Sequence, residues 1–187
     1  MIHFVVALPP EADALSKRYG MEPREGAFPW FSSEEAALVV SGVGKIAAAA
    51  AAAYLHARTG ENPFGVWLNF GTAGHRDRLR GDVVVAHTVT DGASGKRWYP
   101  PRLDGPSLDA VEVRTVDRPE SAFDSEAAYD MEASGFVSAA LRFSTAELVQ
   151  SIKIVSDNRE TTLSAWTSGA VRDLVESRLE AVSSAVA

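Results

Sequence analysis

The sequence contains no cysteine, and its basic residues form no cluster. The absence of cysteine excludes disulfide bonds, thiolate nucleophiles and thiolate metal sites. Acidic residues outnumber lysine and arginine by 25 to 18, and the basic residues are scattered along the chain. Because a nucleic-acid interface needs a clustered basic patch, we expect no nucleic-acid partner.

Long apolar segments and targeting signals are also missing. The longest run of small apolar residues, 46–53, is too short to span a membrane, so we expect no membrane partner. The first eight residues lack the basic start of a signal peptide and end at Pro9-Pro10, which favours a cytoplasmic protein. The 187 residues are 46% apolar and contain no linker-like stretch, so we expect a single domain over 1–187.

Strand-length apolar runs alternate with helical patterns along the chain. The alternation predicts an α/β fold, a three-layer α/β/α sandwich around a largely parallel, mixed sheet. The seven alanines at 47–53 predict a thin helix that packs closely on the sheet or on a neighbouring subunit. We expect strands at 2–8, 36–41, 65–70, 82–90, 111–116 and 151–155, helices at 11–19, 45–58, 132–141 and 163–183, a short helical turn at 144–147 and a loop at 91–109.

One glycine motif resembles a dinucleotide-binding fingerprint. Gly42-Val43-Gly44-Lys45-Ile46-Ala47 fits the G-x-G-x-x-G/A pattern between a strand and a helix. The next strand ends in Asn69-Phe70-Gly71 and lacks the acid that would hold the ribose of the cofactor. We therefore expect no cofactor, and we expect these glycines to bring backbone amides and a helix N-terminus close to a substrate.

Histidine and serine chemistry receive little support. The four histidines show no metal-ligand spacing, so we expect no metal. Only His75, after a glycine-rich turn predicted at 71–74, is placed near a site entrance. The chain has no G-x-S-x-G motif, which argues against serine-type acyl transfer.

Three carboxylates stand where a pocket is expected. Glu11 follows the first strand, Glu132 opens an apolar helix and Asp157 ends the last strand. Each alone could be a helix-terminal or capping acid. Ligands of α/β sheets collect at the carboxyl ends of the strands, and the glycine-rich stretches 42–44 and 71–74 lie at such ends too. Together these positions predict one pocket.

The chain resembles the nucleoside phosphorylase and nucleosidase superfamily, which includes the methylthioadenosine/S-adenosylhomocysteine nucleosidases. The order and spacing of several short motifs carry the resemblance. The motifs are Ala7-Leu8-Pro9-Pro10-Glu11, Ser41-Gly42-Val43-Gly44-Lys45, Asn69-Phe70-Gly71-Thr72-Ala73-Gly74, Asp130-Met131-Glu132-Ala133 and Ile154-Val155-Ser156-Asp157.

The resemblance implies cleavage of the N-glycosidic bond of a purine-type nucleoside. It assigns Glu11 to the activation of water and Asp157 to protonation of the departing base. Cleavage of this bond builds positive charge on the sugar and negative charge on the base, which suits such a pair of carboxyl groups. The other implied contacts are Met131, Glu132 and Thr72 with the ribose, Ser156 and Phe123 with the base, and the backbone of Gly42, Gly44 and Gly71 with the substrate.

Two departures from the family pattern bear on the reaction. Asn69 stands where the phosphorylases carry a phosphate-binding arginine, so hydrolysis is favoured over phosphorolysis. The chain is also short between Val116 and Asp130, where the family builds the wall that contacts the base, and Phe123 belongs to a reduced wall. A phosphorylase, a catalytically idle nucleoside-binding protein and a dinucleotide-binding oxidoreductase stay as alternatives.

Assembly into a homo-oligomer, with a dimer favoured, is a further expectation. Members of the family are oligomers, and the alanine-rich helix offers a surface for close approach. Trp98, Tyr99 and Phe123 stand in polar loops, and exposed aromatic side chains favour an interface or a ligand contact.

Overall fold

The computed structural model describes residues 1–60, 62–101, 108–161 and 167–186. The strands are β1 (Ile2–Val6), β2 (Glu22–Arg24), β3 (Trp30–Ser32), β4 (Ala36–Val40), β5 (Val66–His75), β6 (Val83–Asp91), β7 (Arg97–Trp98), β8 (Asp109–Thr115), β9 (Ala128–Asp130) and β10 (Val149–Asp157). The helices are α1 (Pro9–Arg18), α2 (Lys45–Thr59), α3 (Ala133–Ala140), α4 (Ser168–Glu176) and α5 (Leu179–Val186), with a 3-10 turn at Ala146–Leu148.

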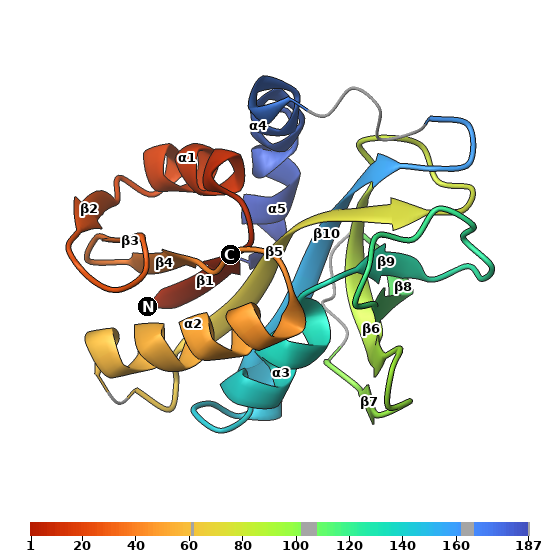
Figure 1. Cartoon of the computed structure of the whole chain (residues 1–187). Coiled ribbons are helices and arrows are strands. Elements are labelled where there is room, and N and C mark those ends of the chain that lie inside the picture. Colours follow the sequence, from red (N-terminus) through yellow and green to blue (C-terminus); the bar gives the residue numbers. More distant parts are fainter. Residues whose placement is uncertain (61, 102–107, 162–166, 187) are drawn as a thin grey trace.

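The strands form one mixed sheet with a parallel centre. β4, β1, β5 and β10 run parallel as consecutive neighbours, and β3 and β2 extend the sheet beyond β4 as antiparallel strands. On the other side β10 pairs with β6, β6 with β8, β8 with β9, and β9 returns to β5. The prediction of a mixed α/β fold is confirmed. Part of the sheet, β5, β10, β6, β8 and β9, closes on itself, a feature that the predicted three-layer sandwich did not include (Figure 1).

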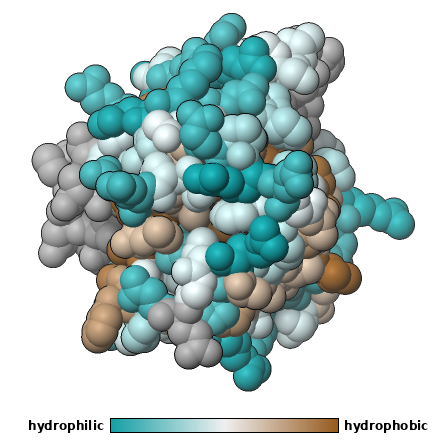
Figure 2. Space-filling view, turned by 90° about the vertical axis from the view of Figure 1, so that its left-hand side faces the viewer, coloured by the Kyte–Doolittle hydropathy of each residue, from teal (hydrophilic) through white to brown (hydrophobic). Residues whose placement is uncertain are grey.

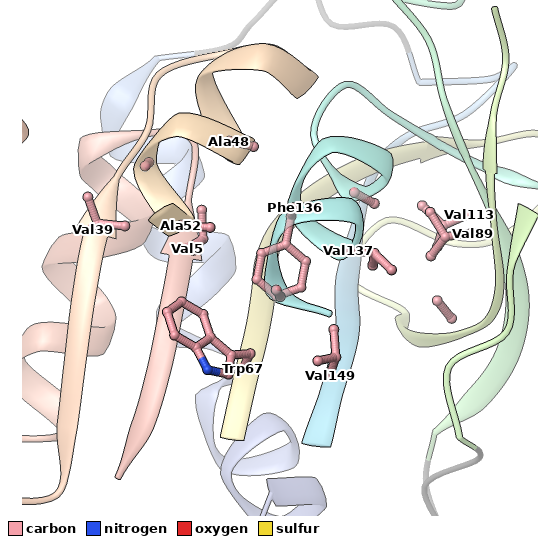
Figure 3. Packing of buried hydrophobic residues seen from close by; sticks show 14 of the residues in the cluster. Val5, Val39, Ala48, Ala52, Trp67, Val89, Val113, Phe136, Val137 and Val149 are labelled. Carbon is pink, nitrogen blue, oxygen red and sulfur yellow. The ribbon is translucent and has the colours of Figure 1, made fainter. Parts of the chain in front are cut away.

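Helices pack on both faces of the sheet. α2 and α3 contribute to one buried cluster, in which Phe136 and Val137 lie with Trp67 and Val149 (Figure 3). Residues of α1, α4 and α5 contribute to the second cluster, which includes Leu15 and Val175. In Figure 1 α1, α4 and α5 lie above the parallel strands and α2 and α3 lie below them. Strands covered on both faces carry continuous apolar runs, which explains the pattern of 36–40 and 2–6.

The alanine-rich helix packs on the sheet as expected. Ala48, Ala51 and Ala52 are fully buried on the face of α2 that contacts the core. At its N-terminus α2 approaches α3 so closely that a Cβ added to Gly135 would lie 1.8 Å from the carbonyl oxygen of Lys45. Small residues at this contact therefore fix the distance between the two helices.

The glycine-rich segment 71–74 is a strand, contrary to the prediction of a turn. β5 runs on to His75 because β10 pairs with it through Thr72 and Ala73, and β9 pairs with Gly74. Small residues serve close side-chain approach here. A Cβ on Gly71 would lie 3.0 Å from Glu11 Oε1, and one on Gly74 would lie 2.5 Å from the ring of Phe123.

The predicted single terminal helix over 163–183 is also wrong within the described residues. α4 starts at Ser168, after Thr167 accepts a hydrogen bond from the amide of Ala170, and it ends at Glu176 before α5 begins. Positions 163–166 lie outside the described residues. Three short strands, β2, β3 and β9, were not predicted, and β7 falls in the expected loop 91–109, of which 102–107 lie outside the described residues.

The face shown in Figure 2 is covered mainly by hydrophilic residues, with apolar ones in small patches. No helix among the described residues is long and apolar enough to span a membrane.

Candidate active site

A cavity of about 170 Å³ lies at the carboxyl ends of the parallel strands β1, β5 and β10. Its walls come from six parts of the chain: the start of α1, Val43 before α2, the distal half of β5, the segment after β8, the junction of β9 and α3, and the end of β10. Its polar and charged side chains are Glu11, Thr72, Glu120, Tyr129, Asp130, Glu132, Lys153, Ser156 and Asp157. The carboxylates predicted to meet, Glu11, Glu132 and Asp157, thus share this cavity.

Glu11 lies in the first turn of α1, with 1% of its surface exposed. Its Oε2 accepts hydrogen bonds from the amides of Ala7 (3.1 Å) and Leu8 (2.9 Å), and its Oε1 accepts one from the amide of Thr72 (3.2 Å). Burial outweighs these bonds and the charge of Lys153, and it raises the pKa of Glu11 to about 7. A carboxyl group that titrates near neutral pH suits a general base.

Glu132 stands at the N-cap of α3 and is 7% exposed. The amide of Gly44, at the N-cap of α2, donates a hydrogen bond of 2.8 Å to Glu132 Oε1. Burial raises the pKa of Glu132 against the opposing charge of Lys153. The glycine-rich start of α2 therefore holds a carboxylate of the protein, and neither Gly42 nor Gly44 is part of the cavity wall, whereas Val43 is.

Asp157 is the last residue of β10, and its carboxyl group forms a hydrogen bond with the hydroxyl of the preceding residue, Ser156. The Ser156 hydroxyl lies 2.5 Å from Asp157 Oδ1 and donates to the carbonyl oxygen of Ala73 at 3.1 Å. Burial raises the pKa of Asp157, and the bond to Ser156 opposes the rise. One hydroxyl proton serves one acceptor well, so a protonated Asp157 that donates to Ser156 satisfies both contacts.

The other substrate contacts predicted from the sequence, apart from Gly42 and Gly44, lie on the cavity wall. Met131, Thr72, Gly71, Ser156 and Phe123 all line the cavity. Phe123 is 2% exposed and adopts a left-handed backbone conformation with φ of 47°. The wall segment is anchored at this point, because Arg159 donates to the carbonyl oxygens of Ala122 and Phe123.

Three aromatic residues considered in the sequence analysis, His75, Trp98 and Tyr99, do not line the cavity. His75 is buried, and its Nε2 lies 3.0 Å from the carbonyl oxygen of Glu126. Trp98 is half-buried against the core of its own chain, and Lys96 lies 4.7 Å above its ring. Tyr99 is 71% exposed. The expectation that His75 lies at the site entrance is therefore wrong.

Sequence reasoning missed Lys153 and Asp130 as functional candidates. Lys153 Nζ lies 2.8 Å from Asp130 Oδ2, and the two side chains are 1% and 0% exposed. The available signal was a lysine inside the apolar run 152–155, since a buried amine needs a paired charge. Lys153 is the only cation on the cavity wall formed by the described residues, against five carboxyl groups.

Comparison with solved structures places this architecture among known enzymes. The fold is that of the nucleosidases. 5′-Methylthioadenosine/S-adenosylhomocysteine nucleosidase from S. pneumoniae aligns with a TM-score of 0.78 and 17% identity, over 99% of this chain and 97% of that one. The Neisseria meningitidis nucleosidase gives the same values. Futalosine hydrolase of Helicobacter pylori gives 0.75 and 14%, over 99% and 96%. No protein-family model and no curated protein sequence matches the chain.

Proposed function

We propose that this protein hydrolyses the N-glycosidic bond of a purine-type nucleoside without a metal or cofactor. The observation that carries the proposal is the convergence of Glu11, Glu132 and Asp157 on one cavity at the carboxyl end of the sheet. Structures with this fold include nucleosidases crystallised with a transition-state inhibitor and with adenine. Their identity to this chain is 17% and 20%, so the activity rests on the site.

Two carboxyl groups divide the chemistry. Glu11, with its pKa raised to about 7, removes a proton from the attacking water as it adds to the anomeric carbon. Burial raises the pKa of Asp157, and its carboxyl group gives a proton to a ring nitrogen of the departing base. Glu132 accepts hydrogen bonds from the ribose hydroxyls, and Met131 and Thr72 complete the sugar contact. Ser156 and Phe123 contact the base.

The charge of the cavity favours hydrolysis over phosphorolysis. Five carboxyl groups and one ammonium group line it, and that ammonium is already paired with Asp130. Such a surface stabilises the positive charge that develops on the sugar in the transition state. It also repels a phosphate dianion, because like charges destabilise each other strongly at buried sites.

The size of the cavity restricts how a nucleoside binds. About 170 Å³ is below the ~300–1,000 Å³ that is typical of small-molecule sites. A bound nucleoside therefore extends through the opening or displaces part of the wall segment that carries Val116, Pro119 and Phe123. We expect Phe123→Ala to enlarge the cavity and to raise KM for the substrate more than it lowers kcat.

The proposal includes a homodimer, a cytoplasmic location and a single domain over 1–187 with a three-layer α/β/α arrangement. Val43 and Ile46 support the dimer, because they are 56% and 82% exposed at the start of α2, and Val43 also lines the cavity. An apolar side chain at a site opening favours an interface there. Light scattering at micromolar concentration tests this part, with an expected mass of twice the 20.0 kDa of the chain.

A base-release assay over a panel of purine nucleosides, with and without phosphate, tests the reaction. We expect free base and free sugar at a rate that phosphate does not change. A sugar 1-phosphate product would establish a phosphorylase instead. Nucleoside binding by calorimetry without base release would identify a catalytically idle binding protein, and dinucleotide binding would support the oxidoreductase alternative.

A further inference from the structure

Lys153 brings a buried positive charge to the wall of the active-site cavity. The side chain is 1% exposed in the middle of β10, and the strand is buried along its whole length. Glu11 and Glu132 line the same cavity, and the charge of Lys153 acts on both of them. Nevertheless the ammonium group forms its ion pair with Asp130.

The carboxylate of Asp130 accepts hydrogen bonds from three other groups besides its ion pair with Lys153. Its Oδ1 accepts a hydrogen bond of 2.8 Å from the hydroxyl of Thr115. Its Oδ2 accepts bonds from the amides of Glu132 (3.2 Å) and Ala133 (2.7 Å), in addition to the contact with Lys153. Glu132 itself makes no side-chain cap for α3, so Asp130 satisfies the first amides of that helix. The carboxylate is thus fixed between β8, α3 and β10.

The fixed Asp130 carboxylate determines which carboxyl group the ammonium of Lys153 pairs with. An ammonium group has three donors, and a Lys153 without Asp130 would turn to the nearest free carboxylates of the cavity. The other ionisable groups that face the cavity are Glu11, Glu120, Tyr129, Glu132 and Asp157. An ion pair with Glu11 would weaken it as a base, and one with Glu132 would occupy the oxygens that hold the sugar.

We propose that Asp130 is a positioning residue of the hydrolytic reaction, which binds the ammonium group of Lys153 and so leaves Glu11 and Glu132 free for water and sugar. The inference rests on the function proposed above for this cavity. It assigns a purpose to a buried ion pair, a kind of interaction that by itself is weak evidence for a gain in stability. Lys153 in turn supplies one compensating charge among the cavity carboxylates.

Titration of the carboxyl groups tests the proposal without any need for turnover. The side-chain carboxyl carbons of Glu11 and Glu132 are followed by NMR against pH in the wild type, Asp130→Asn, Lys153→Met and the double variant. Asp130→Asn frees the ammonium, so the pKa of both glutamates falls by about one pH unit or more, while Lys153→Met removes the cation and raises both. The double variant returns both close to the wild-type values.

The pH dependence of base release gives the second readout. We expect the acid limb of kcat/KM to move to lower pH in Asp130→Asn, with a lower plateau, and to higher pH in Lys153→Met. Asp13→Asn is the matched control, because it removes an ion pair with Arg172 on the same helix as Glu11 but at the surface. Neither the titration nor the pH profile changes in that variant.

The outcomes separate this proposal from the proposed function. If Asp130→Asn lowers thermal stability and leaves both titrations in place, Asp130 is a helix cap and the proposal is wrong. Should Asp130→Asn not fold, unchanged titrations in Lys153→Met and the double variant overturn it equally. A wild type that releases no base overturns the function, whereas opposite shifts in the two single variants still establish the charge placement.

Discussion

The titration of Glu11 predicts a specific dependence of activity on pH. The carboxyl group is 1% exposed, and burial raises its pKa to about 7. A general base must be ionised to act, so the active fraction is about a tenth at pH 6 and about a hundredth at pH 5. We therefore expect kcat/KM to fall about tenfold for each pH unit below 7.

Initial rates of base release between pH 5 and pH 8 measure this limb. Glu11→Gln removes the base, so it lowers kcat by about two to four orders of magnitude and abolishes the acid limb. The hydrogen bonds from Ala7, Leu8 and Thr72 make Glu11→Asp a useful partner variant, because a shorter side chain cannot reach all three amides. A flat profile between pH 8 and pH 5, or an unchanged limb in Glu11→Gln, refutes the role of Glu11 as the base.

Three further predictions concern single residues. Asp157→Asn lowers base release by about two to four orders of magnitude, while calorimetry shows that nucleoside binding is retained; near-normal turnover would make Asp157 a structural residue. Gly135→Ala forces a Cβ to 1.8 Å from the backbone of Lys45, so we expect the free energy of unfolding measured in urea to fall by more than ~3 kcal/mol. The control Gly169→Ala, whose Cβ meets nothing closer than 3.8 Å, leaves the urea midpoint nearly unchanged. Burial lowers the pKa of His3 to about 4, so this residue makes the wild type lose stability as the pH falls from about 6.5 to 4. His3→Phe keeps an aromatic ring but takes up no proton, so urea unfolding of the variant lacks this loss.

The sequence was sufficient for the elements with a strong apolar pattern. The strands at 2–6 and 36–40 and the alanine-rich helix appear within two residues of their expected bounds. β2 has three residues, Glu22, Pro23 and Arg24, and all are exposed, so no apolar pattern marked it. β9 is buried but also has only three residues, which is too short for a pattern to show. The closure of the sheet depends on pairing between distant segments such as 74–75 and 128–129, which local patterns do not encode.

The glycines illustrate why part of the site could not be predicted. Gly71 and Gly74 predicted a turn, whereas in the structure they make room for Glu11 and Phe123 on an extended strand. Gly44 was expected to offer its amide to a substrate, and it donates to Glu132 instead. Both differences arise from contacts between residues about fifty or more positions apart. The type of residue was visible in the sequence, but its contact partner was not.

Two buried groups set how stability depends on pH and act in opposite directions: His3, near the start of β1, and Glu11, at the cavity. His3 has a lowered pKa, so its contribution is complete above about pH 6.5 and is lost as pH falls towards 4, to a total of about 3 kcal/mol. Glu11 has a raised pKa, so its contribution is complete below about pH 4.5 and is lost as pH rises through 7, by a similar amount of about 3 kcal/mol.

The two slopes oppose each other between about pH 4.5 and pH 6.5 and act alone outside that range. Burial also raises the pKa of Glu132 and Asp157, which adds to the loss on the alkaline side. The free energy of unfolding is therefore expected to be lower at pH 8 than at pH 6, and a ligand with a positively charged sugar mimic recovers the difference by compensating the ionised carboxylates. Urea unfolding at the two pH values decides this, since an increase in stability from pH 6 to pH 8 would contradict the burial of ionised carboxylates at the cavity. The acidity that suits the cavity to an oxocarbenium-like transition state is thus the same property that destabilises the empty protein where Glu11 is fully active.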